Sequence, residues 1–226
     1  MVQQAVSHAS SMVRPCAIPP LGLPGELGVP GGARGLVVFA HGSGSGLGSP
    51  RNRAVAEHLR RDGLATLLFD LLLPAEEGDS RKMFDPLFLS DRLLQVLDWA
   101  GGVREARGLA VGLFGASTGA AVALAAAARF PDRIDAIVAR GGRPDLVLPV
   151  LALVRAPTLL LVGGADEEVL ELNRRALIRF GGPVALEVVP GAGHLFAEPG
   201  ALDQVALRAS AWFLRHLGAG AQGRGP

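Results

Sequence analysis

A serine, a histidine and an aspartate occur in an order that suits nucleophilic catalysis. Ser117 lies in Gly115-Ala116-Ser117-Thr118-Gly119, a G-x-S-x-G pattern between an apolar run and an alanine-rich stretch. Between a strand and a helix, this pattern predicts a sharp, strained turn that lifts the serine Oγ above the sheet edge. The turn also places Oγ at a helix N-terminus, where free N–H groups favour developing negative charge. We therefore predict that Ser117 is a nucleophile; the alternative is a serine that only caps the helix.

A hydroxyl nucleophile requires a base, and His194 is the best placed of the five histidines. It ends the loop Pro190-Gly191-Ala192-Gly193-His194, after a predicted strand and at the sheet end where Ser117 is expected. Asp166 follows another predicted strand and can accept the His194 Nδ1–H, which fixes the tautomer and stabilises the imidazolium. Three alternatives stay open: His194 as a solvated loop residue, Asp166 as a helix cap, and Glu168 as the acid.

The tetrahedral intermediate of acyl transfer requires two N–H donors. One donor is expected to be the backbone N–H of Thr118, the residue after the predicted nucleophile. The second is expected from the glycine-rich turn His41-Gly42-Ser43-Gly44-Ser45-Gly46, where we predict the Ser43 N–H, with Gly42 as the alternative. A phosphate-binding glycine loop is disfavoured because neither a Lys-Ser/Thr pair nor a G-x-G-x-x-G pattern is present here. His41 is interpreted as an orienting, structural residue.

Two arginines are expected near the same edge of the sheet. Arg140 directly follows a predicted strand, and Arg143 comes shortly after it. One interpretation is that they bind a carboxylate of the substrate. The other is that they pair with acidic residues of adjacent loops, for which the candidates are Asp70, Glu76 and Glu77.

Alternating apolar runs and helical patterns must position these residues. The runs are almost continuously apolar, as expected for parallel strands that are covered on both faces. The predicted strands are 35–40, 65–71, 109–114, 134–139, 158–163 and 185–190, and the predicted helices are 50–62, about 87–100, 118–129, 167–180 and 200–217. This alternation predicts a doubly wound α/β fold with a mainly parallel sheet and helices on both faces. The proline-rich segment 14–33 is expected to form only short edge strands.

Composition bounds the remaining possibilities. The chain has 226 residues with a net charge of +1, which gives no reason to expect nucleic acid or an anionic membrane as a partner. Cys16 is the single cysteine, so no intrachain disulfide is possible. No secretory signal or apolar run long enough to span a bilayer is recognised, and a cytoplasmic protein is expected. One domain is predicted over residues 14–217, with flexible ends at 1–13 and 218–226; the oligomeric state stays open.

Together these motifs resemble the α/β-hydrolase superfamily, and within it the small dienelactone-hydrolase-like proteins without a cap domain. The resemblance covers residues 14–217 and rests on HGSGSG (41–46), SPRNRAVAEHL (49–59), GASTG (115–119), ARGGRPDL (139–146), VGGADEEV (162–169) and GAGHLFAEPGAL (191–202). HGSGSG, SPRNR and RGGRPDL are also similar to a subgroup found fused to phosphoribosyltransferase domains. Dienelactone hydrolases use a cysteine nucleophile, whereas this chain has Ser117.

The resemblance implies the same roles for Ser117, Asp166, His194 and the two oxyanion donors. Since serine replaces cysteine, a general esterase is favoured over a dienelactone hydrolase. We expect hydrolysis of small carboxylic esters without a metal or an organic cofactor. The alternatives are a thioesterase, an acyltransferase or a cofactor-free perhydrolase on the same triad, and a non-catalytic accessory module.

Overall fold

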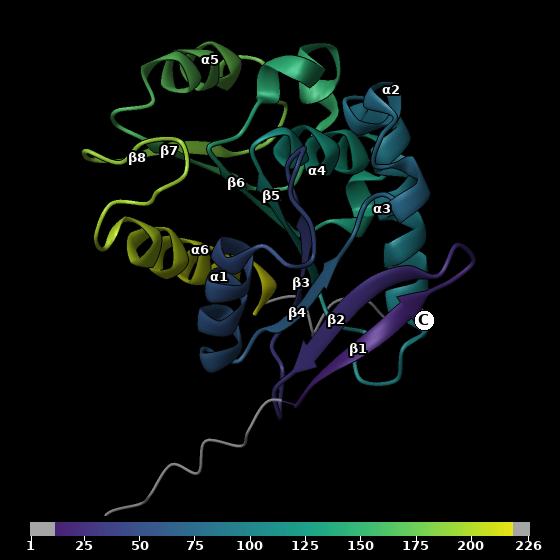
Figure 1. The fold of residues 1–226 in the computed structure, drawn as a ribbon. Helices are drawn as coiled ribbons and strands as arrows, with labels where there is room; N and C mark the ends of the chain where they lie inside the picture. The colour runs from purple at the N-terminus through teal and green to yellow at the C-terminus, as the bar shows by residue number, and fades with distance from the viewer. Residues whose placement is uncertain (1–11, 219–226) are drawn as a thin grey trace, which may run out of the picture.

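The computed structural model describes residues 12–218, which form one eight-stranded sheet flanked by helices (Figure 1). The strand order is β1-β2-β4-β3-β5-β6-β7-β8. Six of these strands, β4 to β8 together with β3, run parallel. The strands are β1 (Met12–Ile18), β2 (Leu23–Val29), β3 (Leu36–Ala40), β4 (Ala65–Phe69), β5 (Val111–Ala116), β6 (Ala136–Arg140), β7 (Thr158–Gly163) and β8 (Val184–Val189).

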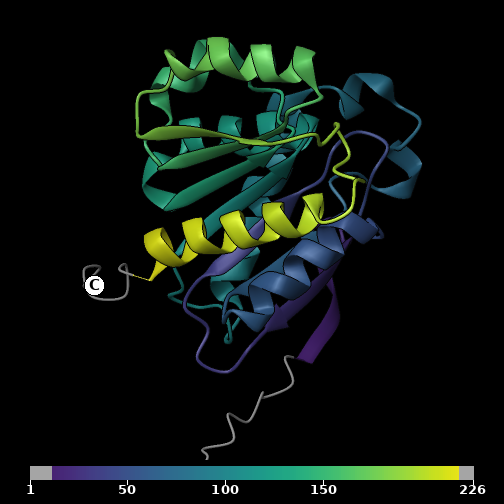
Figure 2. The same cartoon turned by 90° about the vertical axis from the view of Figure 1, so that its left-hand side faces the viewer.

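The helices lie on both faces of the sheet, so the predicted doubly wound α/β class is confirmed. Helices α1 and α6 lie side by side on one face, and α3, α4 and α5 cover the other (Figures 1 and 2). The helices are α1 (Pro50–Arg61), α2 (Ser80–Met83), α3 (Pro86–Gly102), α4 (Thr118–Arg129), α5 (Glu167–Leu177) and α6 (Ala201–Leu217). Among residues 12–218, no helix is long and apolar enough to cross a membrane.

The chain reverses its direction of travel across the sheet between β3 and β5. From β3 it passes through α1 to β4 on one side, and then through α3 to β5 on the other side. In open α/β sheets, ligands bind beyond the carboxyl ends of the strands at such a switch point. The loops after β3 and β5 carry the glycine-rich turn and Ser117, so the fold brings both to this place.

The proline-rich N-terminal segment differs from the prediction of short edge strands. It forms a hairpin in which β1 is the edge, while β2 is internal and pairs with both β1 and β4. Pro24 is tolerated because the β2–β4 ladder covers only Gly25 to Gly28, and Pro15 lies on the edge strand. The strand begins at Met12, so residues 12 and 13 belong to the sheet and not to a flexible end. Apart from these two and Gly218, the predicted flexible ends lie outside the described residues.

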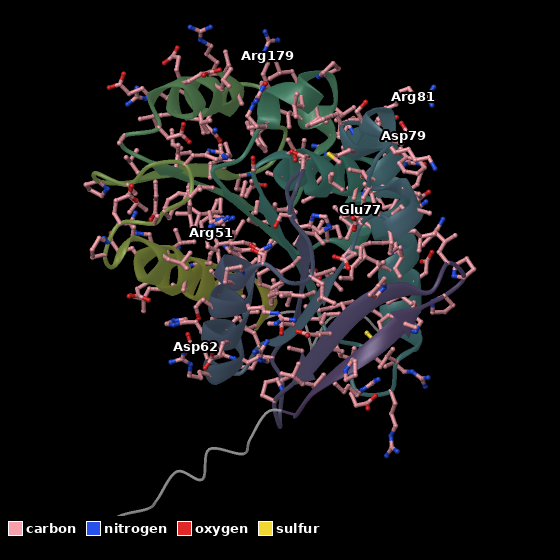
Figure 3. All side chains as sticks on the ribbon, viewed as in Figure 1. Arg51, Asp62, Glu77, Asp79, Arg81 and Arg179 are labelled. Carbon is pink, nitrogen blue, oxygen red and sulfur yellow. The ribbon has the colours of Figure 1, made fainter. Side chains whose placement is uncertain are left out.

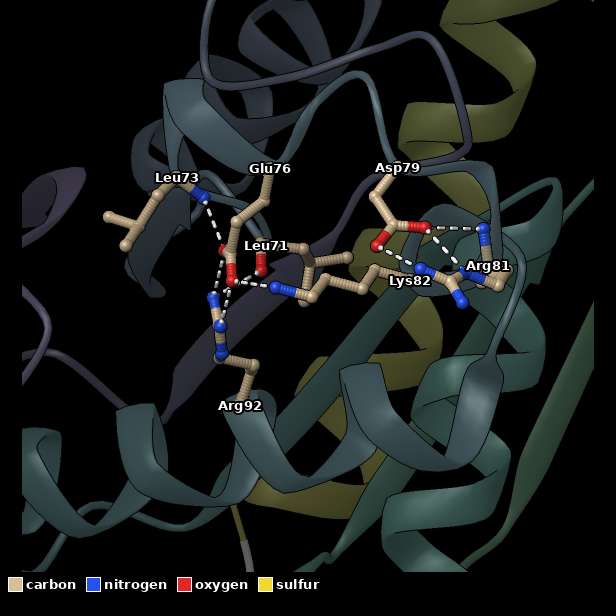
Figure 4. Close-up of polar contacts among 7 residues, drawn as sticks. All are labelled: Leu71, Leu73, Glu76, Asp79, Arg81, Lys82 and Arg92. Carbon is tan, nitrogen blue, oxygen red and sulfur yellow. Dashed lines mark hydrogen bonds and ion pairs between the residues drawn. The ribbon is translucent and has the colours of Figure 1, made fainter.

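Glu76 links the segment between β4 and α3 to helix α3 through its carboxylate. Glu76 accepts hydrogen bonds from Arg92 (2.8 and 2.9 Å), from Lys82 Nζ (2.8 Å) and from the Leu73 N–H (3.0 Å), as Figure 4 shows. Nearby, Asp79 binds the backbone N–H and guanidinium of Arg81. The hydrogen bonds from Arg92 and Lys82 lower the pKa of Glu76 to about 2.

Replacing Glu76 with glutamine is expected to destabilise the protein at neutral pH by ~2 kcal/mol, because charge-assisted hydrogen bonds are lost. The native pKa of Glu76 lies below its ordinary value of 4.5, so the stabilisation is present above that value. It is lost as the pH falls towards about 2. Urea unfolding across this pH range should therefore show the two proteins converging in acid. Glu77→Gln, an exposed neighbour, serves as control; a difference between wild type and Glu76→Gln that persists in acid would contradict the assignment.

Candidate active site

Ser117 occupies a strained turn between β5 and α4. Its backbone has φ 53° and ψ −122°, a combination that costs a residue with a side chain of order 1–3 kcal/mol. The turn is held because the Ser117 N–H donates to the Arg140 carbonyl oxygen (3.0 Å), while its own carbonyl accepts the N–H of Arg143 (3.2 Å). The predicted elbow is therefore present, and it raises the serine side chain at the carboxyl end of β5.

The two glycines of the pattern allow this turn to form. A Cβ on Gly119 would lie 2.1 Å from the carbonyl oxygen of Ala40, and one on Gly115 would lie 2.5 Å from Ala120 Cα. Both distances are far below van der Waals contact, and both opposing atoms belong to backbone. The glycines thus let α4 approach β3 and β5 closely, as the sequence pattern predicts.

The structure brings the three predicted side chains together in a chain of hydrogen bonds. Ser117 Oγ lies 3.1 Å from His194 Nε2, and His194 Nδ1 lies 2.7 Å from Asp166 Oδ2. If Nδ1–H donates to the carboxylate, Nε2 is left to accept the Ser117 proton. The Asp166 side chain is 14% exposed and that of His194 is 37% exposed, so the acid is shielded while the base remains open to a substrate.

Asp166 stands just before α5, and its carboxylate is committed to His194. It makes no side-chain capping bond to the helix, which disfavours the helix-cap interpretation. Glu168, the alternative acid, lies two residues further along, in the first turn of α5, and is exposed. The arrangement also disfavours His194 as an uninvolved, solvated loop residue.

Close backbone approaches fix the position of the imidazole. A Cβ on Gly163 would lie 2.2 Å from the carbonyl oxygen of Ala192, so the loops that carry Asp166 and His194 pack directly against each other. Gly141, at φ 54°, lies beneath the ring, where a Cβ would be 3.4 Å from His194 Cε1. Gly141, directly after β6, and Gly163, the last residue of β7, therefore allow the close packing that positions the histidine.

The expected second oxyanion donor is occupied in this structure. The Ser43 N–H donates to Thr118 Oγ1 at 2.8 Å, a bond that the sequence does not predict. Ser43 can serve an oxyanion only if the Thr118 hydroxyl gives up or shares this hydrogen bond. Gly42, the alternative, lies against the nucleophile, because a Cβ there would be 3.1 Å from Ser117 Cβ. Thr118 is the first residue of α4, and the first N–H groups of a helix lack intrahelical partners.

His41 orients the neighbouring loop. One ring nitrogen, Nδ1, lies 2.9 Å from the Gly42 carbonyl oxygen, and the other, Nε2, accepts the Leu71 N–H at 2.9 Å. Burial lowers the pKa of His41, which fits a neutral ring that donates on one side and accepts on the other. This agrees with the interpretation of His41 as a structural residue.

A cavity of about 490 Å³ is lined by Ser117, His194 and Arg140, among others. Arg143 is held elsewhere, since it donates to both carboxylate oxygens of Asp145 at 2.8 and 2.7 Å. The sequence predicted Asp70, Glu76 or Glu77 as the acidic partner of Arg143, and that prediction is wrong. Glu76 binds Arg92, and Asp70 accepts the Leu47 N–H at 2.6 Å.

Sequence reasoning missed Arg51, which also lines the cavity. It lies in the first turn of α1, at the end opposite Asp62 (Figure 3). A cation in the first turn of a helix opposes the helix dipole, and this unfavourable placement after a glycine-rich loop was the available signal. The Thr118 hydroxyl was missed because its bond to Ser43 joins residues 75 positions apart.

Proteins similar to this chain are found both among curated sequences and among solved structures. Two Mycobacterium tuberculosis proteins, from strains CDC 1551 and H37Rv, are 54% identical over 198 residues, and both are provisionally named phosphoribosyl transferases. The match covers 88% of this chain but 45% of each relative, so the chain spans about half the length of these proteins.

Among solved structures, a dienelactone hydrolase from Anabaena variabilis is 47% identical, with a TM-score of 0.87 over 92% of this chain and 98% of the other. Est1E from Butyrivibrio proteoclasticus has a TM-score of 0.76 at 18% identity, over 91% and 99% of the two chains, and shows the fold alone. The model of the alpha/beta hydrolase fold matches residues 35–182. The chain therefore belongs to the α/β-hydrolase family, as its motifs and sheet order had indicated.

Proposed function

We propose that this protein is a serine hydrolase that cleaves small carboxylic esters through an acyl-enzyme on Ser117. The observation that carries the proposal is the hydrogen-bond chain from Ser117 Oγ to His194 Nε2 (3.1 Å) and from His194 Nδ1 to Asp166 (2.7 Å) at a strained elbow. Family membership and the similar dienelactone hydrolase support a hydrolase. The ester class and the serine intermediate are inferred from the geometry and chemistry of the residues.

In the acylation step, His194 Nε2 accepts the hydroxyl proton while Ser117 Oγ attacks the ester carbonyl carbon. Asp166 holds the imidazole and stabilises its positive charge. The carbonyl oxygen becomes an oxyanion, for which the Thr118 N–H and a loop N–H, from Ser43 or Gly42, are the proposed donors. Each such donor is worth ~3 kcal/mol of transition-state stabilisation. The intermediate collapses, and the alcohol leaves with the proton from His194.

Deacylation repeats these steps with water as the nucleophile. His194 takes a proton from the water, which attacks the acyl carbon, and the acid is released as Ser117 regains its proton. The proposed steps use only side chains and backbone N–H groups of the chain, the ester and one water molecule. We also propose a cytoplasmic location, for which the support is the single cysteine, Cys16.

A panel of acyl donors tests the reaction class. We expect the highest kcat/KM for acetyl and butyryl p-nitrophenyl esters and a lower value for palmitoyl esters, because the cavity of about 490 Å³ is lined mostly by glycine and serine residues. Acyl-CoA thioesters, and esters assayed for peroxide-dependent turnover, form the other arms. Faster turnover of the thioester, or activity only with peroxide, would replace the esterase proposal by one of these reactions.

A further inference from the structure

The cavity beside Ser117 contains positive charge that is not neutralised. Arg140 is 7% exposed, and its Nε and Nη1 atoms are buried without a hydrogen-bond partner among residues 12–218. The Nε atom of Arg51 is also buried and has no partner within the same part of the chain. Both arginines line the cavity, and no acidic residue of the described chain lines it with them.

Arg140 differs from Arg92, the other arginine that is almost fully buried within residues 12–218. Arg92, with 8% of its side chain exposed, binds Glu76, and Arg143 binds Asp145. Burying a charge without a partner is costly in free energy, and proteins normally compensate such a charge by pairing. The missing compensation at Arg140 is therefore a reason to expect that a negative charge arrives with a ligand.

Arg140 is also charged at neutral pH. Burial, together with the charge of Arg51, lowers the pKa of Arg140 to about 10. Since this value lies well above neutrality, the guanidinium stays protonated. The same pKa shift reflects the mutual repulsion of the two cations, which an anion between them would relieve.

The surroundings hold Arg140 in place. Its guanidinium lies over the ring of Phe196, 5.9 Å from the centroid, and Phe196 is 1% exposed with φ 53°. A strained backbone at a fully buried aromatic residue persists only where the surrounding structure determines it. Arg51 projects from the first turn of α1, which contains no acidic residue and whose dipole adds positive potential. The cavity is thus a built site for an anion.

Charge decides which anion fits. A carboxylate brings one negative charge, whereas a phosphate monoester carries about 1.5 to 2 at neutral pH and offers three acceptor oxygens. Guanidinium groups bind phosphate through paired N–H donors. Two arginines and a helix N-terminus therefore match a phosphate better than a carboxylate.

We propose that the carboxylic ester cleaved by this enzyme carries a phosphate group, which Arg51 and Arg140 bind in the cavity next to Ser117. This inference rests on the proposed esterase function and adds the substrate class to it. It also replaces the carboxylate suggested for Arg140 and Arg143 by the sequence, because Arg143 is already paired.

Three acetate esters of one short alcohol test the proposal; they differ only in ending in a hydroxyl, a carboxylate or a phosphate. For the wild type we expect kcat/KM to be about ten-fold or more higher for the phosphate than for the hydroxyl compound. The ratio should fall close to one in Arg140→Met and be reduced in Arg51→Gln. Arg143→Gln, the matched control outside the cavity, should keep the wild-type ratio.

Thermal unfolding gives a readout that does not depend on turnover. Arg140→Met should melt no lower than the wild type, since it removes an uncompensated charge, whereas Arg92→Met should melt lower because Glu76 loses the two hydrogen bonds that it accepts from Arg92. Inorganic phosphate should raise the melting temperature of the wild type and not that of Arg140→Met.

Hydrolysis of all three esters at equal rates, or a preference for the carboxylate, would overturn the phosphate proposal while leaving the esterase intact. A phosphate-induced rise in melting temperature that persists in Arg140→Met would also overturn it. If none of the three esters is hydrolysed, the esterase proposal itself fails. The rise in melting temperature with inorganic phosphate then tests the anion site by itself.

Discussion

Replacing Ser117 with alanine is expected to lower kcat/KM for a short-acyl ester by roughly 10⁴- to 10⁶-fold, the scale of loss when a serine nucleophile is removed. The covalent step cannot occur without Oγ, and His194 then has no proton to accept from the enzyme. The melting temperature should stay nearly unchanged. Alanine can occupy the same φ 53° turn as serine, and among residues 12–218 the side chain of Ser117 loses one hydrogen bond, the 3.1 Å contact with a partly exposed ring.

A control variant at a buried serine outside the site distinguishes an effect on catalysis from an effect on folding. Ser210 is 2% exposed on α6 and donates to Asp62, so Ser210→Ala should lower the melting temperature and leave kcat/KM close to that of the wild type. Steady-state kinetics and thermal unfolding of both variants make the comparison. Substantial esterase activity in Ser117→Ala, less than ten-fold below that of the wild type, would refute the acyl-enzyme on this residue.

Replacing Gly119 with alanine is expected to produce a large loss of stability from a single methyl group. The new Cβ would lie 2.1 Å from the Ala40 carbonyl oxygen and 2.5 Å from that of His41. Neither atom can move away cheaply, because both belong to the end of β3 and the loop that follows. Forcing α4 and this loop apart should cost about 3 kcal/mol. The melting temperature should then fall by roughly 6–12 °C.

The same displacement should lower esterase activity, since Gly42 and Ser43 lie in that loop. Gly101→Ala provides the control, because nothing lies within 4 Å of its Cβ position in α3. That variant should be as stable as the wild type or slightly more stable, as expected for alanine in a helix. A Gly119→Ala protein that melts with the wild type would show that α4 does not approach β3 as closely as described.

The nucleophile and its neighbours were predictable because their signals are local. The strand before Ser117, the helix after it and the two glycines lie within a short stretch, and β7 and β8 fix where Asp166 and His194 emerge. The predicted strand 158–163 and helix 118–129 match the structure residue for residue. Because these strands are parallel, their carboxyl ends lie at one edge of the sheet, where the three side chains meet.

What the sequence did not predict depends on which side chains compete for a partner. Arg140 lies at the expected edge of the sheet, but within residues 12–218 its Nε and Nη1 atoms have no hydrogen-bond partner. Glu76, one of its predicted partners, binds Arg92 and Lys82 instead. The Ser43 N–H was expected to face an oxyanion, yet the Thr118 hydroxyl accepts it. These pairings join segments that are far apart in the sequence, and no periodicity or motif predicts them. The internal position of β2 was missed for the same reason, since prolines indicate where a ladder is interrupted but not which strands flank it.

Labelling with a fluorophosphonate, followed by intact mass measurement and peptide mapping, tests the central claim most directly. The reagent phosphonylates a serine only when a base activates its hydroxyl. We predict a single adduct, located on the peptide that contains Ser117, and no adduct on Ser117→Ala. An unlabelled wild-type protein, under conditions where a known serine esterase reacts fully, or an adduct on another residue, would contradict the assignment of Ser117 as the activated nucleophile.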